Sequence, residues 1–241
     1  HETLGVLDIN KMNKKLHFSA IFISLIMTAC STSINPLVIG HRGARGHIAE
    51  NTLPSISKAI SLGVDGVEID VFRCATGELV VFHDQTLEKL TNTYGFIEQL
   101  DLDSIRNIKV LDHYTIPTLD EVLDLIDGRV LLNIELKGTQ TALLTTQLFQ
   151  RYFEETKWSS DKIIISSFNW EELEIFYQVN SNVPIAVLTE DDPLDAIAIG
   201  KKLNAVAINP DYKSLDKNNI EKIKKAGFKI YPWTVNTHES I

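Results

Sequence analysis

The stretch Gly66-Val67-Glu68-Ile69-Asp70-Val71 decides the fold. Its β-branched apolar residues predict a strand that is buried on both faces, as strands of parallel sheets are. Six further apolar runs are also predicted as strands: residues 36–40, 130–137, 162–168, 184–189, 205–210 and 228–236. This many buried strands in a chain of 241 residues indicates one large sheet with a sizeable core.

Helix-start signals lie between these runs. The segment Thr118-Leu119-Asp120-Glu121 is a capping box, in which a hydroxyl and a carboxylate accept hydrogen bonds from free backbone N–H groups. Thr52 is expected to begin another helix, which ends at Gly63. Asn169 is expected to cap a third helix together with Glu172. Single helices therefore alternate with the strands.

Such an alternation predicts parallel strands joined by right-handed crossovers, in either a doubly wound sheet or an eight-stranded barrel. No G-x-G-x-x-G motif follows the first strand, so the usual phosphate loop of a dinucleotide-binding sheet is missing from the sequence. A TIM-type (β/α)8 barrel is favoured. Its chemistry is expected at the C-terminal ends of the strands.

Acidic and basic residues fall at those strand ends. Side chains alternate between the faces of a strand, so Glu68 and Asp70 share one face, as do Glu135 and Lys137. A single acidic residue here is as consistent with a helix cap, but like charges held so close need a cation or raised pKa values. A hard divalent metal ion, Mg²⁺ or Ca²⁺, meets that need with oxygen ligands.

Two histidines are expected beside these carboxylates. His41 ends the first strand. Residues 71–84 are too few for a crossover helix and predict a hairpin that turns at Thr76-Gly77, which places His83 opposite Asp70. A lone histidine is more often structural, but two histidines near a carboxylate cluster can supply a general acid and a general base.

The net charge and the cysteine content exclude some classes of function. The formal net charge of -9 argues against an extended surface that follows a phosphate backbone, so nucleic acid is not an expected partner. The two cysteines, Cys30 and Cys74, match no zinc pattern and cannot build a disulfide framework.

The first residues carry a different pattern. Lys14-Lys15, an apolar run and then small residues predict a signal peptide over residues 12–29. Its end, Met27-Thr28-Ala29-Cys30, resembles a bacterial lipoprotein signal, in which the cysteine is lipidated. A plain secretory signal and a buried apolar helix are the alternatives.

The organisation that follows has three parts around this signal peptide. Residues 1–11 are expected to lie upstream of a natural start, residues 30–36 to form a linker, and residues 37–241 to form the barrel domain with an insertion at 85–115. The protein is expected to be exported and lipid-anchored to a bacterial membrane, facing the periplasm or the cell exterior.

An ordered series of motifs resembles those of the glycerophosphodiester phosphodiesterases, from about residue 38 to the end of the chain. The motifs are His41-Arg42-Gly43, Glu50-Asn51-Thr52-Leu53, Gly66 to Val71, Val81-Phe82-His83-Asp84, Ile116-Pro117-Thr118-Leu119, Glu135-Leu136-Lys137, Ser167-Phe168 and Trp233-Thr234-Val235-Asn236. The resemblance implies a barrel of the phospholipase-C-like phosphodiesterase type. It also implies hydrolysis of glycerophosphodiesters to sn-glycerol 3-phosphate and an alcohol.

The resemblance further implies a role for each residue of the site. The metal ligands would be Glu68, Asp70 and Glu135; the acid and base His41 and His83; the phosphate-binding cations Arg42 and Lys137; and the pocket residues Phe168 and Trp233. The chain departs from the family pattern at Cys74, Thr76 and Lys89, which lie on the hairpin or in the insertion.

Several alternatives stay open at this point. The histidine that acts as base, the attacking group (water or the glycerol 2-hydroxyl), the head group and the metal are not decided by the sequence. A related lyase or phospholipase could act on intact phospholipid or lysophospholipid, although no amphipathic basic helix or exposed aromatic loop is evident. A non-catalytic binding lipoprotein would tolerate the loss of His41 or His83, and both are present.

The end of the sequence bears on barrel closure. Only residues 237–241 follow the last predicted strand, which leaves no room for a further helix and strand. We therefore expect the eighth strand to be missing from this chain, so that the first and seventh strands have unpaired edges.

Overall fold

The computed structural model describes residues 36–237. The expectations for residues 1–11, for the signal peptide at 12–29 and for Cys30 concern residues outside this range. No helix of the described part is long and apolar enough to cross a membrane.

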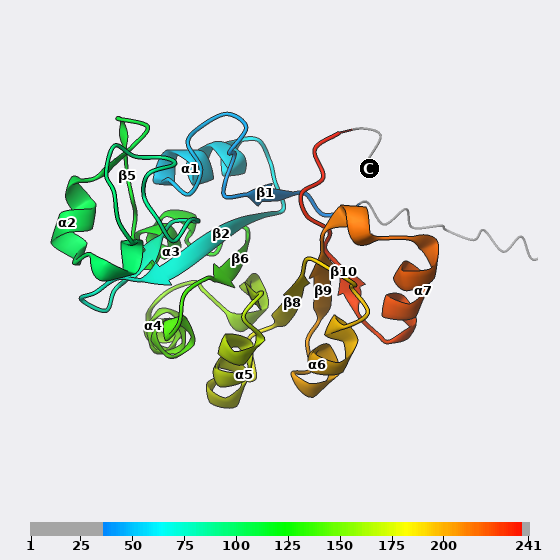
Figure 1. Cartoon of the computed structure of the whole chain (residues 1–241). Helices are drawn as coiled ribbons and strands as arrows, with labels where there is room; N and C mark the ends of the chain where they lie inside the picture. The colour runs from blue at the N-terminus through cyan, green and yellow to red at the C-terminus, as the bar shows by residue number, and fades with distance from the viewer. Residues whose placement is uncertain (1–35, 238–241) are drawn as a thin grey trace, which may run out of the picture. The chain divides into compact units, whose positions relative to one another are not determined.

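A curled parallel sheet forms the centre of the described structure (Figure 1). Its strands pair in the order β1 (Ile39–His41), β2 (Gly66–Arg73), β6 (Leu131–Leu136), β7 (Ile163–Ser167), β8 (Ile185–Thr189), β9 (Ala207–Pro210) and β10 (Lys229–Ile230). Each predicted strand forms, and each pairs with its expected neighbour along the chain. The fold is therefore that of a TIM-type barrel, with its wall open between β1 and β10 in the described residues.

Helices cover the outer face of this sheet (Figure 1). They are α1 (Leu53–Ser61), α3 (Leu119–Ile126), α4 (Thr141–Glu155), α5 (Trp170–Val179), α6 (Ala196–Lys202) and α7 (Lys217–Lys225). The Thr52 cap of α1 and the Thr118 capping box of α3 form as predicted. Apolar side chains of the strands and helices, among them Ile69, Ile134 and Phe176, pack into one large core between the two layers.

Glu172 does not join the predicted cap of α5. The Asn169 side chain accepts a hydrogen bond from the Glu171 N–H, whereas Glu172 is buried and reaches the start of α4. There its carboxylate accepts hydrogen bonds from Gln140 N, Thr141 Oγ1 and Ala142 N. One helix thus supplies the N-terminal cap of its neighbour, because the free N–H groups of α4 have no acceptor of their own.

The hairpin forms with a register one residue from the predicted one. Strand β3 (Leu79–Val81) pairs antiparallel with β2. Phe82 rather than His83 lies opposite Asp70, and the Phe82 N–H donates to the Asp70 carbonyl. The reason is the turn: Cys74 N–H donates to Glu78 O, which closes the loop one position earlier than a symmetric turn at Thr76-Gly77 would.

The insertion at 85–115 packs against this hairpin. It contains the 3₁₀ helix η1 (Ile97–Gln99), α2 (Leu102–Asn107) and a small hairpin of β4 (Lys109–Val110) and β5 (Tyr114–Thr115). Its buried side chains form a second apolar cluster with Phe72 and Phe82, separate from the barrel core. Tyr94 and Phe96 are 83% and 49% exposed, so the insertion carries exposed aromatic side chains that the sequence analysis did not find. Apolar periodicity does not reveal which loop residues remain uncovered.

The last predicted strand is shorter than expected. Regular pairing in β10 covers two residues, although Tyr231 N–H and Trp233 N–H continue to donate to carbonyls of β9. Pro232 has no N–H to offer towards the open edge of the sheet, which suits an edge position. Within residues 36–237, no strand bridges β1 and β10.

Candidate active site

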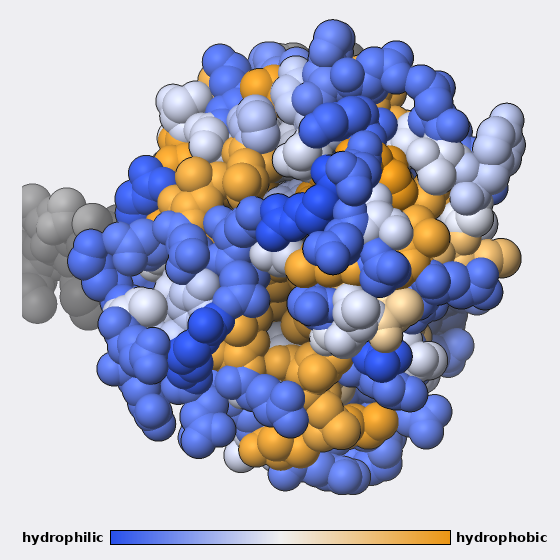
Figure 2. Space-filling model, turned by 90° about the vertical axis from the view of Figure 1, so that its left-hand side faces the viewer, coloured by the Kyte–Doolittle hydropathy of each residue, from blue (hydrophilic) through white to orange (hydrophobic). Residues whose placement is uncertain are grey.

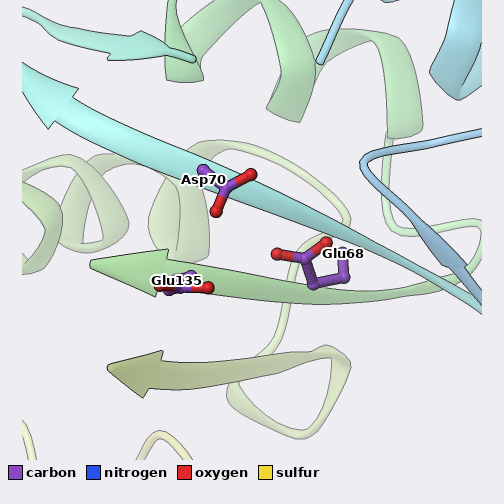
Figure 3. A group of neighbouring side chains, drawn as sticks. All are labelled: Glu68, Asp70 and Glu135. Atoms are coloured by element: carbon purple, nitrogen blue, oxygen red, sulfur yellow. The ribbon is translucent and has the colours of Figure 1, made fainter. Parts of the chain in front are cut away.

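Three carboxylates meet on the inner face of the sheet. Glu68 and Asp70 extend from β2, and Glu135 extends from the neighbouring β6, where its Cα is the direct partner of the Cα of Asp70 (Figure 3). One oxygen from each carboxylate lies within 4.8 Å of one from each of the others. All three residues are buried, as expected for side chains inside a barrel.

The electrostatics of this cluster favour a cation. Burial raises the pKa of Asp70 to about 6, and the charge of Glu135 adds to the shift. Burial, together with the charges of Asp70 and Glu135, raises the pKa of Glu68 well above its usual range. The Asp70 Oδ1 atom is buried and accepts no hydrogen bond from the described residues. Oxygen donors with excess negative charge fit a hard divalent metal ion.

Two cationic side chains border the carboxylates. The Arg42 backbone N–H donates to Glu68 Oε2 at 3.0 Å, and its side chain contacts Glu50 at 2.6 Å. The Arg42 Nε atom lies 3.4 Å from Asp70 Oδ2. Lys137 Nζ lies 3.0 Å from Glu135 Oε1 and 3.3 Å from His83 Nε2. Both cations therefore offset part of the negative charge of the cluster.

The two histidines lie beside the cluster with different partners. His83 Nδ1 is 2.6 Å from Asp84 Oδ1. His41 Nδ1 is 2.9 Å from Thr234 Oγ1 and 3.4 Å from Arg45 Nη1, and its Nε2 is 3.8 Å from Glu68. Burial lowers the pKa of both rings, and the positive charges of Arg42 and Arg45 help to bring that of His41 to about 3.

Asn51 and Glu50 belong to the site although they were not among the predicted site residues. The Asn51 amide donates to Asp70 Oδ2 at 2.8 Å, and the Asp70 N–H donates back to Asn51 Oδ1 at 3.4 Å. Glu50 pairs with Arg42. The motif Glu50-Asn51-Thr52-Leu53 was visible in the sequence, but these contacts depend on how the loop after β1 folds over β2.

Two aromatic side chains flank the same end of the sheet. Phe168 follows β7 and is 41% exposed, and its ring meets that of Trp233 edge to face at 5.6 Å. The Trp233 indole N–H donates to Asn209 O at 2.9 Å, which fixes the ring.

Figure 2 looks onto the end of the molecule that carries the insertion, where hydrophilic residues surround apolar ones.

Every predicted site residue in the described range thus lies at one end of an open parallel barrel: His41, Arg42, Glu68, Asp70, His83, Glu135, Lys137, Phe168 and Trp233. Buried carboxylates, two histidines and two cations thus gather at the C-terminal strand ends of a TIM-type barrel, where such barrels carry their catalytic residues. Residues 41–241 match the glycerophosphoryl diester phosphodiesterase family. The chain belongs to that family, and the family is one of phosphoric diester hydrolases.

Several relatives of the chain are named as enzymes of this kind. A glycerophosphodiester phosphodiesterase of Caldanaerobacter subterraneus subsp. tengcongensis is 33% identical over 85% of this chain and 88% of its own. One of Bacillus subtilis is 30% identical over 83% of this chain and 76% of its own. A solved structure of an Oleispira antarctica phosphodiesterase, in complex with the product sn-glycerol-3-phosphate, has a TM-score of 0.78 and 27% identity. It covers 85% of this chain and 87% of its own.

Proposed function

We propose that this protein hydrolyses glycerophosphodiesters to sn-glycerol 3-phosphate and an alcohol in a reaction that requires a divalent metal ion. The observation that carries the proposal is the carboxylate cluster of Glu68, Asp70 and Glu135 between two histidines. Relatives that bear this activity in their names, and a structural neighbour with the product bound, support the substrate class.

The hydrogen bonds assign opposite tautomers to the two histidines. An ionised Asp84 can only accept, so His83 carries its proton on Nδ1, and its Nε2 lone pair faces the Lys137 ammonium. Arginine can only donate, so Arg45 requires the Nδ1 of His41 to accept, and the His41 proton lies on Nε2. His83 therefore presents a base and His41 a proton donor.

A reaction sequence follows from these tautomers. His83 Nε2 removes the proton of the attacking group, and the adjacent Asp84 carboxylate stabilises the imidazolium that forms. The neutral His41 ring donates a hydrogen bond from its Nε2–H to the oxygen of the departing alcohol, which takes its proton from solvent water. The proton transfer at His83 contributes on the order of 10² to 10⁴ in rate. Trapping of a cyclic phosphate product would identify the glycerol 2-hydroxyl as the attacking group, and its absence under the same conditions would identify water.

The remaining site residues hold and orient the phosphate. Arg42, with its guanidinium fixed by Glu50, and Lys137 place positive charge beside the phosphate oxygens, where negative charge grows in the transition state. Glu68, Asp70 and Glu135 would hold Mg²⁺ or Ca²⁺. When bound, such an ion supplies Lewis-acid polarisation of the phosphoryl group. Phe168 and Trp233 would contact the glycerol carbon atoms.

The test is a coupled assay for release of glycerol 3-phosphate. Glycerophosphocholine, glycerophosphoethanolamine and glycerophosphoglycerol are offered with and without EDTA, followed by addition of Mg²⁺ or Ca²⁺. We expect release that EDTA abolishes and one of the two ions restores. No release from any of the three compounds would contradict the proposed substrate class, and full activity in EDTA would contradict the metal requirement.

A lysophospholipid is a second candidate substrate. The exposed aromatic side chains Tyr94 and Phe96 of the insertion favour it, because they offer apolar surface to an acyl chain. The same assay with lysophosphatidylcholine compares the two candidates, with choline release as the readout. A kcat/KM above that for glycerophosphocholine would support the lipid substrate.

For the cellular location, we propose export followed by lipid anchoring at Cys30, supported by the sequence of residues 12–30. Expression of the full chain and of a Cys30→Ala variant in a bacterium, followed by membrane fractionation, tests it. The anchor predicts that only the variant leaves the membrane fraction.

A further inference from the structure

Two buried polar groups next to the carboxylate cluster have no partner among the described residues. They are Ser166 Oγ on β7 and Asn133 Oδ1 on β6. Ser166 is fully buried. A buried hydroxyl or amide that forms no hydrogen bond destabilises the folded state, so such a group calls for an explanation.

The strand register places both groups against carboxylates of the site. Glu135 is the direct neighbour of Ser166, and Glu68 is the direct neighbour of Asn133. Directly opposite residues of parallel strands point to the same face, and adjacent strands lie about 4.8 Å apart. Asp70, Glu135 and Ser166 therefore form one row across three strands of the inner face.

This row continues with small side chains. Ala186 of β8 pairs with Ser166, and Ala207 of β9 pairs with Ala186. The interior of a TIM barrel is ordinarily filled by bulky branched residues. The alanines at both positions are smaller than the residues that usually fill this layer.

We propose that Ser166 and Asn133 are positioning residues of the metal centre, whose side chains hydrogen-bond to water ligands of the ion held by Glu68, Asp70 and Glu135. The inference rests on the metal requirement proposed above. Mg²⁺ demands six ligands and keeps several waters, so three carboxylates leave coordination positions for water. Partners that orient the side-chain ligands of a metal typically contribute 10- to 100-fold in metal affinity.

Calorimetric titration of the chelator-treated full chain with MgCl₂ and with CaCl₂ tests the proposal. We expect Ser166→Ala and Asn133→Leu each to weaken Mg²⁺ binding about 10- to 100-fold. Ca²⁺ binding should weaken less, because Ca²⁺ tolerates flexible geometry and holds its waters less strictly. Ser166→Thr keeps the hydroxyl and should restore most of the Mg²⁺ affinity.

Ser167→Ala is the matched control. Ser167 is also fully buried on β7, but it points to the opposite face, and its hydroxyl donates to Leu136 O at 2.6 Å. This variant should lose stability in urea and keep its metal affinity. If Ser166→Ala fails to fold, the metal affinities of Asn133→Leu and Ser166→Thr are compared with that of the wild type instead.

The titration distinguishes a failure of the proposed metal requirement from a failure of the proposed positioning role. If the wild-type chain binds neither ion, the metal requirement itself is wrong and this inference falls with it. If the wild-type chain binds metal and both Ser166→Ala and Asn133→Leu bind it equally well, only the positioning role is overturned.

Discussion

His41 Nδ1 lies 2.9 Å from Thr234 Oγ1, although 193 positions separate the two residues in the chain. His41 belongs to the first strand and Thr234 follows the last, so the contact joins the two sides of the open wall of the barrel. The hydroxyl also supports the tautomer in which His41 carries its proton on Nε2, as its proton donor role requires.

Thr234→Val should therefore weaken turnover without unfolding the protein. The substitution keeps the shape of the side chain and removes the hydroxyl. We expect kcat to fall about fivefold, which corresponds to about 1 kcal/mol for one hydrogen bond. Thr234→Ser should retain the wild-type rate, and ¹⁵N NMR of the imidazole should report a shift in the tautomer ratio for the valine variant. An unchanged ratio would contradict the role of Thr234.

Glu135→Gln should abolish the effect of metal on stability while the fold stays intact. The carboxylate lies next to Asp70 and raises the pKa of that group, so its removal relieves repulsion between buried charges. The metal-free variant should melt at a higher temperature than the metal-free wild type. Addition of Mg²⁺ or Ca²⁺ should raise the melting temperature of the wild type only, as differential scanning fluorimetry can measure.

The raised pKa of Asp70 predicts how stability depends on pH. Burial moves this pKa from 3.8 to about 6, so between these values the folded state binds the proton more tightly than the unfolded state. The contribution of Asp70 to the stability of the metal-free protein is then present below about pH 4 and is lost as the pH rises through 6. Urea unfolding in EDTA should show that the free energy of unfolding falls more between pH 4.5 and pH 6.5 for the wild type than for Asp70→Asn. An equal loss in both proteins would refute the shift.

His41→Ala and His83→Ala should each lower kcat by about 10² to 10⁴, because His83 moves a proton and the His41 N–H stabilises the departing oxygen in the transition state. Circular dichroism should show the wild-type fold for both variants. A loss below tenfold at either position would reassign that histidine to a structural role. His47→Ala, at an exposed position of the same loop as Arg45, serves as the histidine control.

Glu172→Ala should destabilise the protein by several kcal/mol, since three donors at the start of α4 lose their acceptor at about 1–3 kcal/mol each. Glu171→Ala is the control, because Glu171 is exposed on the same helix. The difference between the two variants in the free energy of unfolding by urea measures how much the Glu172 cap stabilises the protein. A difference below about 1 kcal/mol would show that water replaces it.

The strands and their parallel order could be predicted because each strand is apolar on both faces and each is followed by a helix signal. Glu68, Asp70 and Glu135 could be grouped for a related reason: parallel strands end at the same edge, and alternate residues share a face. The grouping needed no knowledge of side-chain geometry.

Other features depend on contacts that the sequence pattern does not encode. The hairpin register shifted by one residue because it follows from the hydrogen bond between Cys74 and Glu78. Glu172 of α5 caps α4, whose first residue lies about thirty positions earlier in the chain. Sequence rules for helix caps consider only neighbouring residues, so they predicted that Glu172 caps its own helix. The contact of Asn51 with Asp70 requires a loop whose path is set by Arg42 and Asn51 in left-handed conformations, which favour glycine.

The insertion has its own apolar cluster, which meets the barrel at Phe72 and Phe82. Substitutions within the insertion can therefore accumulate without forcing the barrel to repack. The insertion is thus open to exchange, whereas the strands that hold the site residues are not. Replacement of this one segment could therefore change which leaving group is accepted, while the same catalytic residues are kept.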